Sequence, residues 1–177
     1  MNDNGAARYV ELAAHCYRMK FFGPDTTKAH ITERLKNIPV FRQLTRNELL
    51  EVNELLHERT YEAGEIIFEK GEIGHGIYII LSGRVRVNPC PELSESAVLE
   101  LATGDLIGEL SLFDETPRLA TLVAAERTSM VALFQSEFSS LLTTNKSIGV
   151  KVLTEITRLM GRRVRQLLVH EKHIPSI

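Results

Sequence analysis

Residues Gly104 to Ala124 read GDLIGELSLFDETPRLATLVA and are the most informative segment of the chain. We interpret it as a strand, a tight glycine turn at Gly108, one short helical turn, a proline corner and a second strand. This order predicts that Glu109 and Arg118 lie on opposite sides of one small loop.

The loop contains the residue types of an anion-binding site. Gly108 has no side chain, so a ligand can approach the backbone, and the N–H groups of residues 110–112 begin a helical turn with unpaired donors. The planar guanidinium of Arg118 can hold a phosphate through two charge-assisted hydrogen bonds. Because Glu109 adds an acceptor, the sequence predicts a ligand that carries both a phosphate and a sugar-like hydroxyl or an amine.

Three features of this stretch resemble the phosphate-binding cassette of cyclic nucleotide-binding domains: Gly-Glu-Leu-Ser-Leu, the nine-residue step from Glu109 to Arg118, and Pro-Arg-Leu-Ala-Thr. The resemblance implies that Arg118 holds the cyclic phosphate and that Glu109 accepts a hydrogen bond from the ribose 2'-hydroxyl. It also implies a cradle of backbone amides from Gly108, Leu110, Ser111 and Ala120. The alternative is that Glu109 and Arg118 form a salt bridge that closes a surface loop.

Bulk composition predicts one globular domain with helical extensions. The chain has 177 residues, of which 44% are hydrophobic and 25% charged, and its net charge is -2. This charge argues against nucleic-acid binding by bulk electrostatics. No signal peptide and no apolar run of membrane-spanning length is recognised, and Cys16 and Cys90 lie in unrelated contexts. We therefore expect a reduced, cytoplasmic protein that makes no direct membrane contact.

The segments before the loop predict helices and then strands. Residues 1–34 form an N-terminal helical extension, which packs on the domain by default or else offers a partner surface. Residues 35–135 form the binding domain, whose leading helix begins at a capping box made by Thr45 and Glu48. Leu44 and Leu49 form the accompanying hydrophobic staple.

From Tyr61 the hydrophobic period changes to two, and glycines separate the strands. Residues 77–81 are apolar throughout, which predicts a strand buried on both faces, whereas residues 84–87 alternate. Ser82 and Gly83 between them predict a hairpin turn. About eight strands are expected, which is typical of a jelly roll. The predicted fold is thus mainly β, an eight-stranded antiparallel jelly roll or β-roll with N-terminal helices and a long C-terminal helix.

Residues 136–177 predict C-terminal helices that act as a lid and a dimerisation element. The long helix spans about Ser147 to His170 and carries an apolar seam of Leu153, Ile156, Met160, Val164 and Leu167. Part of this helix must cover the barrel, and the remaining apolar surface predicts a homodimer.

Two positions bear on the base of the ligand. In the family that this chain resembles, the final helix often caps the purine, and Arg162, or Leu159 beside it, is the candidate. Directly after the cassette arginine, cGMP-selective relatives tend to place Thr or Ser, whereas this chain has Leu119. The missing hydroxyl favours cAMP over cGMP.

No nucleophile, general base and orienting group occur together, so we expect no enzyme and no cofactor. Among the six histidines, the tail pair His170 and His173 lacks the spacing of a zinc helix, so no metal is expected. Six residues follow Glu171, too few for a helix-turn-helix, which argues against direct DNA binding by a stand-alone bacterial-type member. The leading hypothesis is a cyclic nucleotide receptor whose ligand repositions the C-terminal helix and whose downstream partner is unknown. The alternative is a protein-interaction module that keeps the fold without a physiological ligand.

Overall fold

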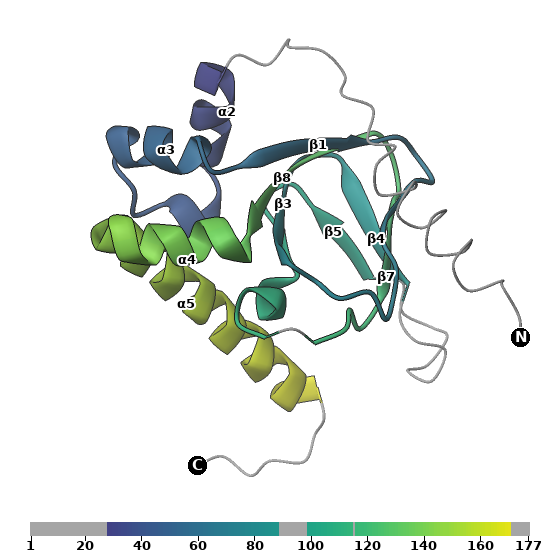
Figure 1. Ribbon diagram of the computed structural model, residues 1–177. Helices are drawn as coiled ribbons and strands as arrows, with labels where there is room; N and C mark the ends of the chain where they lie inside the picture. The colour runs from purple at the N-terminus through teal and green to yellow at the C-terminus, as the bar shows by residue number, and fades with distance from the viewer. Residues whose placement is uncertain (1–27, 89–98, 115, 171–177) are drawn as a thin grey trace, which may run out of the picture.

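The computed structural model describes residues 28–88, 99–114 and 116–170. The N-terminal extension expected over residues 1–34 is described only from Lys28 onward. Cys16, Cys90 and the residues after His170 lie outside the described range. Figure 1 shows helices gathered on one side of the molecule and a roll of strands on the other.

The first described helices pack beside the roll. They are α2 (Lys28–Leu35), the 3-10 helix η1 (Pro39–Phe41) and α3 (Arg46–Asn53). The predicted capping box is confirmed, because the Thr45 side chain accepts from Glu48 N–H and the Glu48 carboxylate accepts from Thr45 N–H. Leu44 and Leu49 are both buried in the core under these helices, as the staple predicted.

In the part of the chain that the structure describes, eight strands form two antiparallel four-stranded sheets, which confirms the predicted mainly-β roll. The first sheet has the order β1-β8-β3-β6 and the second the order β2-β7-β4-β5. Their bounds are β1 His57–Tyr61, β2 Ile66–Phe68, β3 Gly76–Ser82, β4 Arg84–Asn88, β5 Leu99–Ala102, β6 Leu106–Ile107, β7 Thr121–Ala124 and β8 Thr128–Phe134.

β3 lies between two hydrophobic cores, as its continuous apolar sequence predicted. Ile79 belongs to the core shared with the helices, and its neighbour Ile80 belongs to the core between the two sheets. Successive residues of a strand point to opposite faces, and both faces of β3 are covered, so both side chains are fully buried.

The predicted hairpin at Ser82 and Gly83 is wrong. β3 and β4 belong to different sheets, so the chain crosses from one sheet to the other at this point. Gly83 does have the expected positive φ of 92°. A Cβ at Gly83 would lie 2.7 Å from the carbonyl oxygen of Arg127, so glycine is also required because the corner packs against the β7–β8 turn.

Two helices follow the roll, α4 (Gln135–Thr144) and α5 (Lys146–His170). The face of α5 that packs on the core consists of Ile148, Val152 and Ile156. Burial along the predicted seam changes with position: Ile156 is buried against the core, whereas Val164, nearer the end of the helix, is 53% exposed. No described helix has the length and apolar content needed to cross a membrane.

Polar contacts tie the first half of α5 to the N-terminal helices. Lys151 Nζ donates to the Glu48 carboxylate at 2.6 and 2.9 Å, and Asn145 Nδ2 donates to Glu51 at 2.8 Å. Glu155, which is buried, accepts from Gln43, from Arg42 and from Arg158. The C-terminal end of α5 extends past the roll, as Figure 1 shows.

Candidate ligand-binding site

The site begins where β6 ends and the short helix η2 (Glu109–Leu112) starts. Gly108 joins them in a left-handed conformation, with φ 76° and ψ 27°. A Cβ at Gly108 would collide with Nη1 of Arg118. Gly108 therefore meets two requirements, a backbone angle that favours glycine and room for the arginine side chain.

Arg118 is held in place through both its backbone and its side chain. Its N–H donates to Glu72 O at 2.8 Å, and its carbonyl accepts from Gly71 N–H at 2.9 Å. Nη1 donates to Ser111 Oγ at 3.0 Å, and Nη2 donates to Gly76 O at 3.1 Å.

The charge of Arg118 is buried without a compensating carboxylate among the described residues. The residue is 8% exposed, and its two side-chain hydrogen bonds go to neutral oxygens. Burial lowers the pKa of Arg118, and the more distant Tyr78, Glu72 and Glu109 offset only part of this effect. A guanidinium nevertheless stays protonated at neutral pH, so the site presents a buried positive charge.

Glu109 does not pair with Arg118, so the loop-closing salt bridge considered above is absent. Its carboxylate instead accepts from Nη1 of Arg163, on α5. Nη2 of Arg163 donates to Leu106 O, so one arginine bridges β6 and η2. The Glu109 side chain is 13% exposed and that of Arg163 is 33% exposed, which places this ion pair at the rim of the site.

The remaining cassette residues surround Arg118 with different exposures. Ser111 is buried, and its N–H donates to Gly108 O at 3.1 Å within the turn. Leu110 is exposed, Ala120 is half-buried against the core between the sheets, and Leu119 is 76% exposed.

Arg162 and Leu159, the candidates for the base, line a cavity of about 70 Å³ together with Pro39 and Gly104. The neighbouring Arg163 is the residue that contacts Glu109, and the sequence interpretation missed it. The helical register contained a usable signal: continuing the buried series Val152, Ile156 in steps of three and four places residue 163 on the roll side of α5.

Within the described residues, no cluster of three His, Cys, Asp or Glu side chains is arranged to hold a metal ion. The groups that the site offers to a ligand are the buried Arg118 cation, the Glu109 carboxylate at the rim and the turn around Gly108.

Comparison with known proteins places this geometry in a family. The model of the cyclic nucleotide-binding domain matches residues 58–145. The cyclic AMP receptor protein of Thermus thermophilus is 32% identical over 133 residues, which is 75% of this chain and 60% of that protein. A cAMP-dependent protein kinase regulatory subunit of Mycosarcoma maydis is 33% identical over 113 residues, 61% of this chain and 22% of that subunit.

Solved structures agree with the sequence relatives. The crystal structure of the Thermus thermophilus catabolite activator protein has a TM-score of 0.66 and 31% identity, and the alignment covers 75% of this chain and 61% of that one. The chain thus spans less than two thirds of these relatives, which are a receptor, a regulatory subunit and an activator. The matched segment contains the Gly108 turn, Glu109 and Arg118, and the chain belongs to the cyclic nucleotide-binding domain family.

Proposed function

We propose that this protein is a cyclic nucleotide receptor in which Arg118 binds the cyclic phosphate. The observation that carries the proposal is the buried Arg118 guanidinium, which has neutral hydrogen-bond partners and no carboxylate partner among the described residues. A buried charge is costly unless an opposite charge compensates it. A phosphate would supply that charge and accept from the planar fork.

Glu109 is the proposed acceptor for the ribose 2'-hydroxyl, and Arg163 connects this role to α5. In the structure, the Glu109 carboxylate accepts from Arg163. A ribose hydroxyl that donates to the same carboxylate competes with this ion pair. A ligand can shift a helix only through a difference in binding between its two positions, and this competition provides the difference.

The proposed ligand is cAMP in preference to cGMP. Leu119 follows the cassette arginine and is 76% exposed, so its side chain is available to a bound base. An apolar side chain provides surface for a purine but no hydroxyl for the polar edge of guanine. Arg162 remains the proposed cap for the base, which requires the end of α5 to move, because it now lines the cavity beside Pro39.

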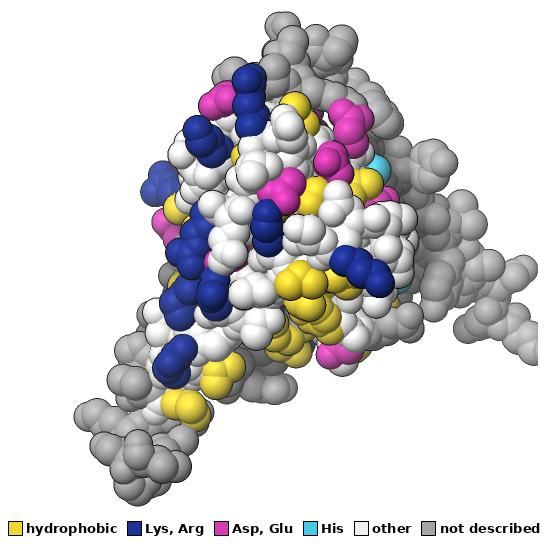
Figure 2. Space-filling model, turned by 90° about the vertical axis from the view of Figure 1, so that its left-hand side faces the viewer, with side chains coloured by type: hydrophobic (Ala, Val, Ile, Leu, Met, Phe, Trp, Pro, Cys, Tyr) yellow, Lys and Arg dark blue, Asp and Glu magenta, His cyan; other side chains and the backbone are white. Residues whose placement is uncertain are grey.

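We also propose a homodimer through the outer face of α5. Val150, Thr157 and Val164 recur there every seven residues and are exposed. Gly161 lies on the same face, where a Cβ would meet only the end of the Arg165 side chain. Figure 2 shows hydrophobic side chains beside a row of Lys and Arg on the side of the molecule where α4 and α5 lie. A second copy of this outer face would cover its apolar surface, with Arg165, whose Nε donates to Gly161 O, at the edge of the contact.

Calorimetric titration of the full chain with cAMP and with cGMP tests the ligand, and thermal unfolding in both nucleotides provides a second readout. We expect saturable binding of cAMP that is tighter than that of cGMP. Equal affinities would remove the assignment to cAMP alone. No heat and no thermal shift at millimolar nucleotide would overturn the receptor proposal and favour the protein-interaction module, in which the Glu109–Arg163 ion pair is simply structural.

A further inference from the structure

The Arg118 guanidinium lies over aromatic rings. Its Cζ is 4.3 Å from the centroid of the Phe68 ring and 5.8 Å from that of Tyr78. The two rings are themselves 5.8 Å apart at an angle of 48°. Phe68 is buried, so the contact with Arg118 forms out of bulk water, where attraction between a cation and a ring is strongest.

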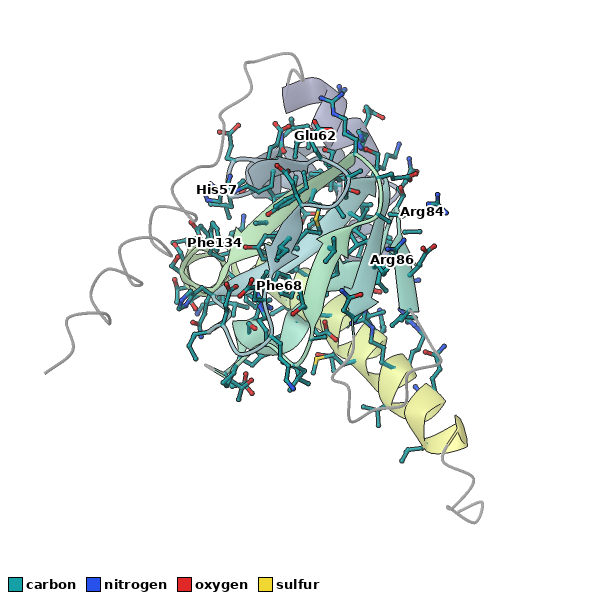
Figure 3. The ribbon with its side chains drawn as sticks, turned by 90° about the vertical axis from the view of Figure 1, so that its right-hand side faces the viewer. His57, Glu62, Phe68, Arg84, Arg86 and Phe134 are labelled. Carbon is teal, nitrogen blue, oxygen red and sulfur yellow. The ribbon has the colours of Figure 1, made fainter. Side chains whose placement is uncertain are left out.

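A β-bulge directs Phe68 into this position. In the register of β2 with β7, Ile66 pairs with Val123 and Phe68 pairs with Leu122, so two steps on β2 match one step on β7. Without the extra residue, Phe68 would point to the same outer face as Ile66, which is 47% exposed. The irregularity in β2 thus places the ring in the interior, next to Arg118. Figure 3 shows Phe68 within the roll, between the sides marked by Phe134 and Arg86.

Other contacts of the guanidinium hold its edge and two of its sides but not the side that faces Phe68. A Cβ at Gly74 would lie 2.6 Å from Arg118 Cζ, and a Cβ at Gly108 would collide with Nη1. Ser111 and Gly76 accept hydrogen bonds at its edge. Ser111 and Gly76 thus hold the edge of the guanidinium, Gly74 and Gly108 pack closely against it, and the Phe68 ring contacts it from a further side.

We propose that Phe68 is a positioning residue for anion recognition, with Tyr78 as its weaker partner. This inference rests on the proposed function of Arg118. A carboxylate would also stabilise the buried cation, but it would use its N–H donors and repel a phosphate. An aromatic ring stabilises the cation without accepting its N–H donors, so the N–H groups that Ser111 and Gly76 do not use remain for the ligand. Phe68 thus keeps Arg118 buried, oriented and cationic without a competing anion.

The first experiment measures the contact between the Arg118 side chain and the Phe68 ring, without any ligand. In ¹H–¹⁵N spectra, the Arg118 Nε–Hε signal is assigned by its loss in Arg118→Lys. We expect this signal to be shifted upfield by the ring in the wild type and in Phe68→Tyr, and to return to ordinary shifts in Phe68→Leu. Ile80→Val, in the same core cluster, is the control for general loosening. An unchanged signal in Phe68→Leu would overturn the proposal.

The second experiment measures cAMP affinity by calorimetry in the same variants. We expect Phe68→Leu to bind about five- to tenfold more weakly, with Phe68→Tyr and Ile80→Val within about twofold of the wild type. If the wild type binds and Phe68→Leu binds equally well, the positioning role is wrong although the receptor proposal stands. If the wild type does not bind, the receptor proposal fails and recognition by this site loses its basis, whatever the spectra show.

A variant that does not fold would not end the test. Tyr78 is half-buried, and Tyr78→Leu removes the more distant ring. We expect about a twofold loss of cAMP affinity in Tyr78→Leu and none in Tyr78→Phe. Equal affinities in both Tyr78 variants and the wild type would contradict a contribution from the aromatic pair.

Discussion

Arg163 on α5 and Glu109 on η2 form an ion pair across 54 residues of sequence, and the same arginine donates to Leu106 O in β6. The first half of α5 is anchored to the N-terminal helices through Lys151 and Glu155. Arg163 therefore connects the ligand loop to the part of α5 that extends beyond these anchors, which makes it the contact most directly exposed to competition by a ligand.

Removing Arg163 is expected to tighten nucleotide binding. Arg163→Ala frees the Glu109 carboxylate, and because a partly exposed ion pair contributes about 1 kcal/mol or less, we expect up to about fivefold higher cAMP affinity by calorimetry. Arg165→Ala, on the exposed side of the same helix, is the matched control and should bind like the wild type. Weaker binding by Arg163→Ala would show that Arg163 supports the ligand instead of competing with it.

The movement of α5 can be measured directly. With Cys16 and Cys90 replaced by Ser, spin labels at Gln166 and Arg86 report the distance between the end of α5 and the roll. We expect cAMP to change this distance in the wild-type background and to have a much smaller effect in Arg163→Ala, where the end of α5 is already released. The same distance with and without cAMP, at saturation, would exclude a ligand-driven shift of the helix.

Replacing Arg118 should separate binding from stability. Arg118→Ala is expected to weaken cAMP binding at least tenfold, because a charge-assisted contact to phosphate contributes about 2–3 kcal/mol. Its thermal stability should change little, since the variant also removes an uncompensated buried charge. Arg86→Ala removes an exposed arginine from β4 and serves as the control (Figure 3). Wild-type affinity in Arg118→Ala would remove the role assigned to Arg118.

Gly108 and Gly64 form a matched pair for testing the packing around the arginine. Both have positive φ, 76° and 87°, but a Cβ at Gly64 meets no atom within 4 Å, whereas one at Gly108 collides with Arg118. Alanine at either position costs about 1 kcal/mol for the backbone angle, and Gly108→Ala should cost about 1–3 kcal/mol more. Urea denaturation gives both values, and equal losses would contradict the packing seen around Arg118.

The contacts that Glu155 makes between α5 and the N-terminal segment are expected to weaken at acidic pH. Burial alone would raise its pKa, but hydrogen bonds from Gln43, Arg158 and Arg42 outweigh this effect and hold the pKa below the ordinary value of 4.5. A carboxyl with a lowered folded-state pKa stabilises the fold above its unfolded pKa and loses that contribution as the pH falls through the folded pKa. Glu155→Gln should therefore cost about 1–3 kcal/mol at pH 7 and progressively less below about pH 4.5. A loss that does not depend on pH would show that the charge is not what matters.

The proposed dimer depends on the outer face of α5 that contains Val150, Thr157 and Val164. Val164→Glu should convert a dimer to a monomer in size-exclusion chromatography with light scattering, because it places like charges against each other across the interface. Gln166→Glu makes the same charge change at another exposed position of the helix and should remain dimeric. A wild type that is monomeric at micromolar concentration would contradict the interface.

Local signals in the sequence determined most of the elements. The alternation of apolar residues, the continuous run in β3, the capping box at Thr45 and the glycine turn at Gly108 each depend on a few neighbouring residues. Such signals specify helices, strands and turns directly, and the family resemblance connected them into an eight-stranded roll. The pairing of strands was harder to predict from sequence. Ser82 and Gly83 fit a hairpin turn, and only the order of strands in the two sheets shows that the chain passes from one sheet to the other there.

Local patterns and the family resemblance were thus enough to predict most elements, the roll and the cassette containing Glu109 and Arg118. The partners of these two side chains could be read only from the folded chain, because they depend on helix register and on strand irregularities. The helical register of α5 directs Arg163, and not its neighbour Arg162, toward Glu109. One extra residue in β2 directs Phe68 into the interior, where its ring contacts Arg118. Contacts between residues tens of positions apart follow from packing, which a local pattern does not encode.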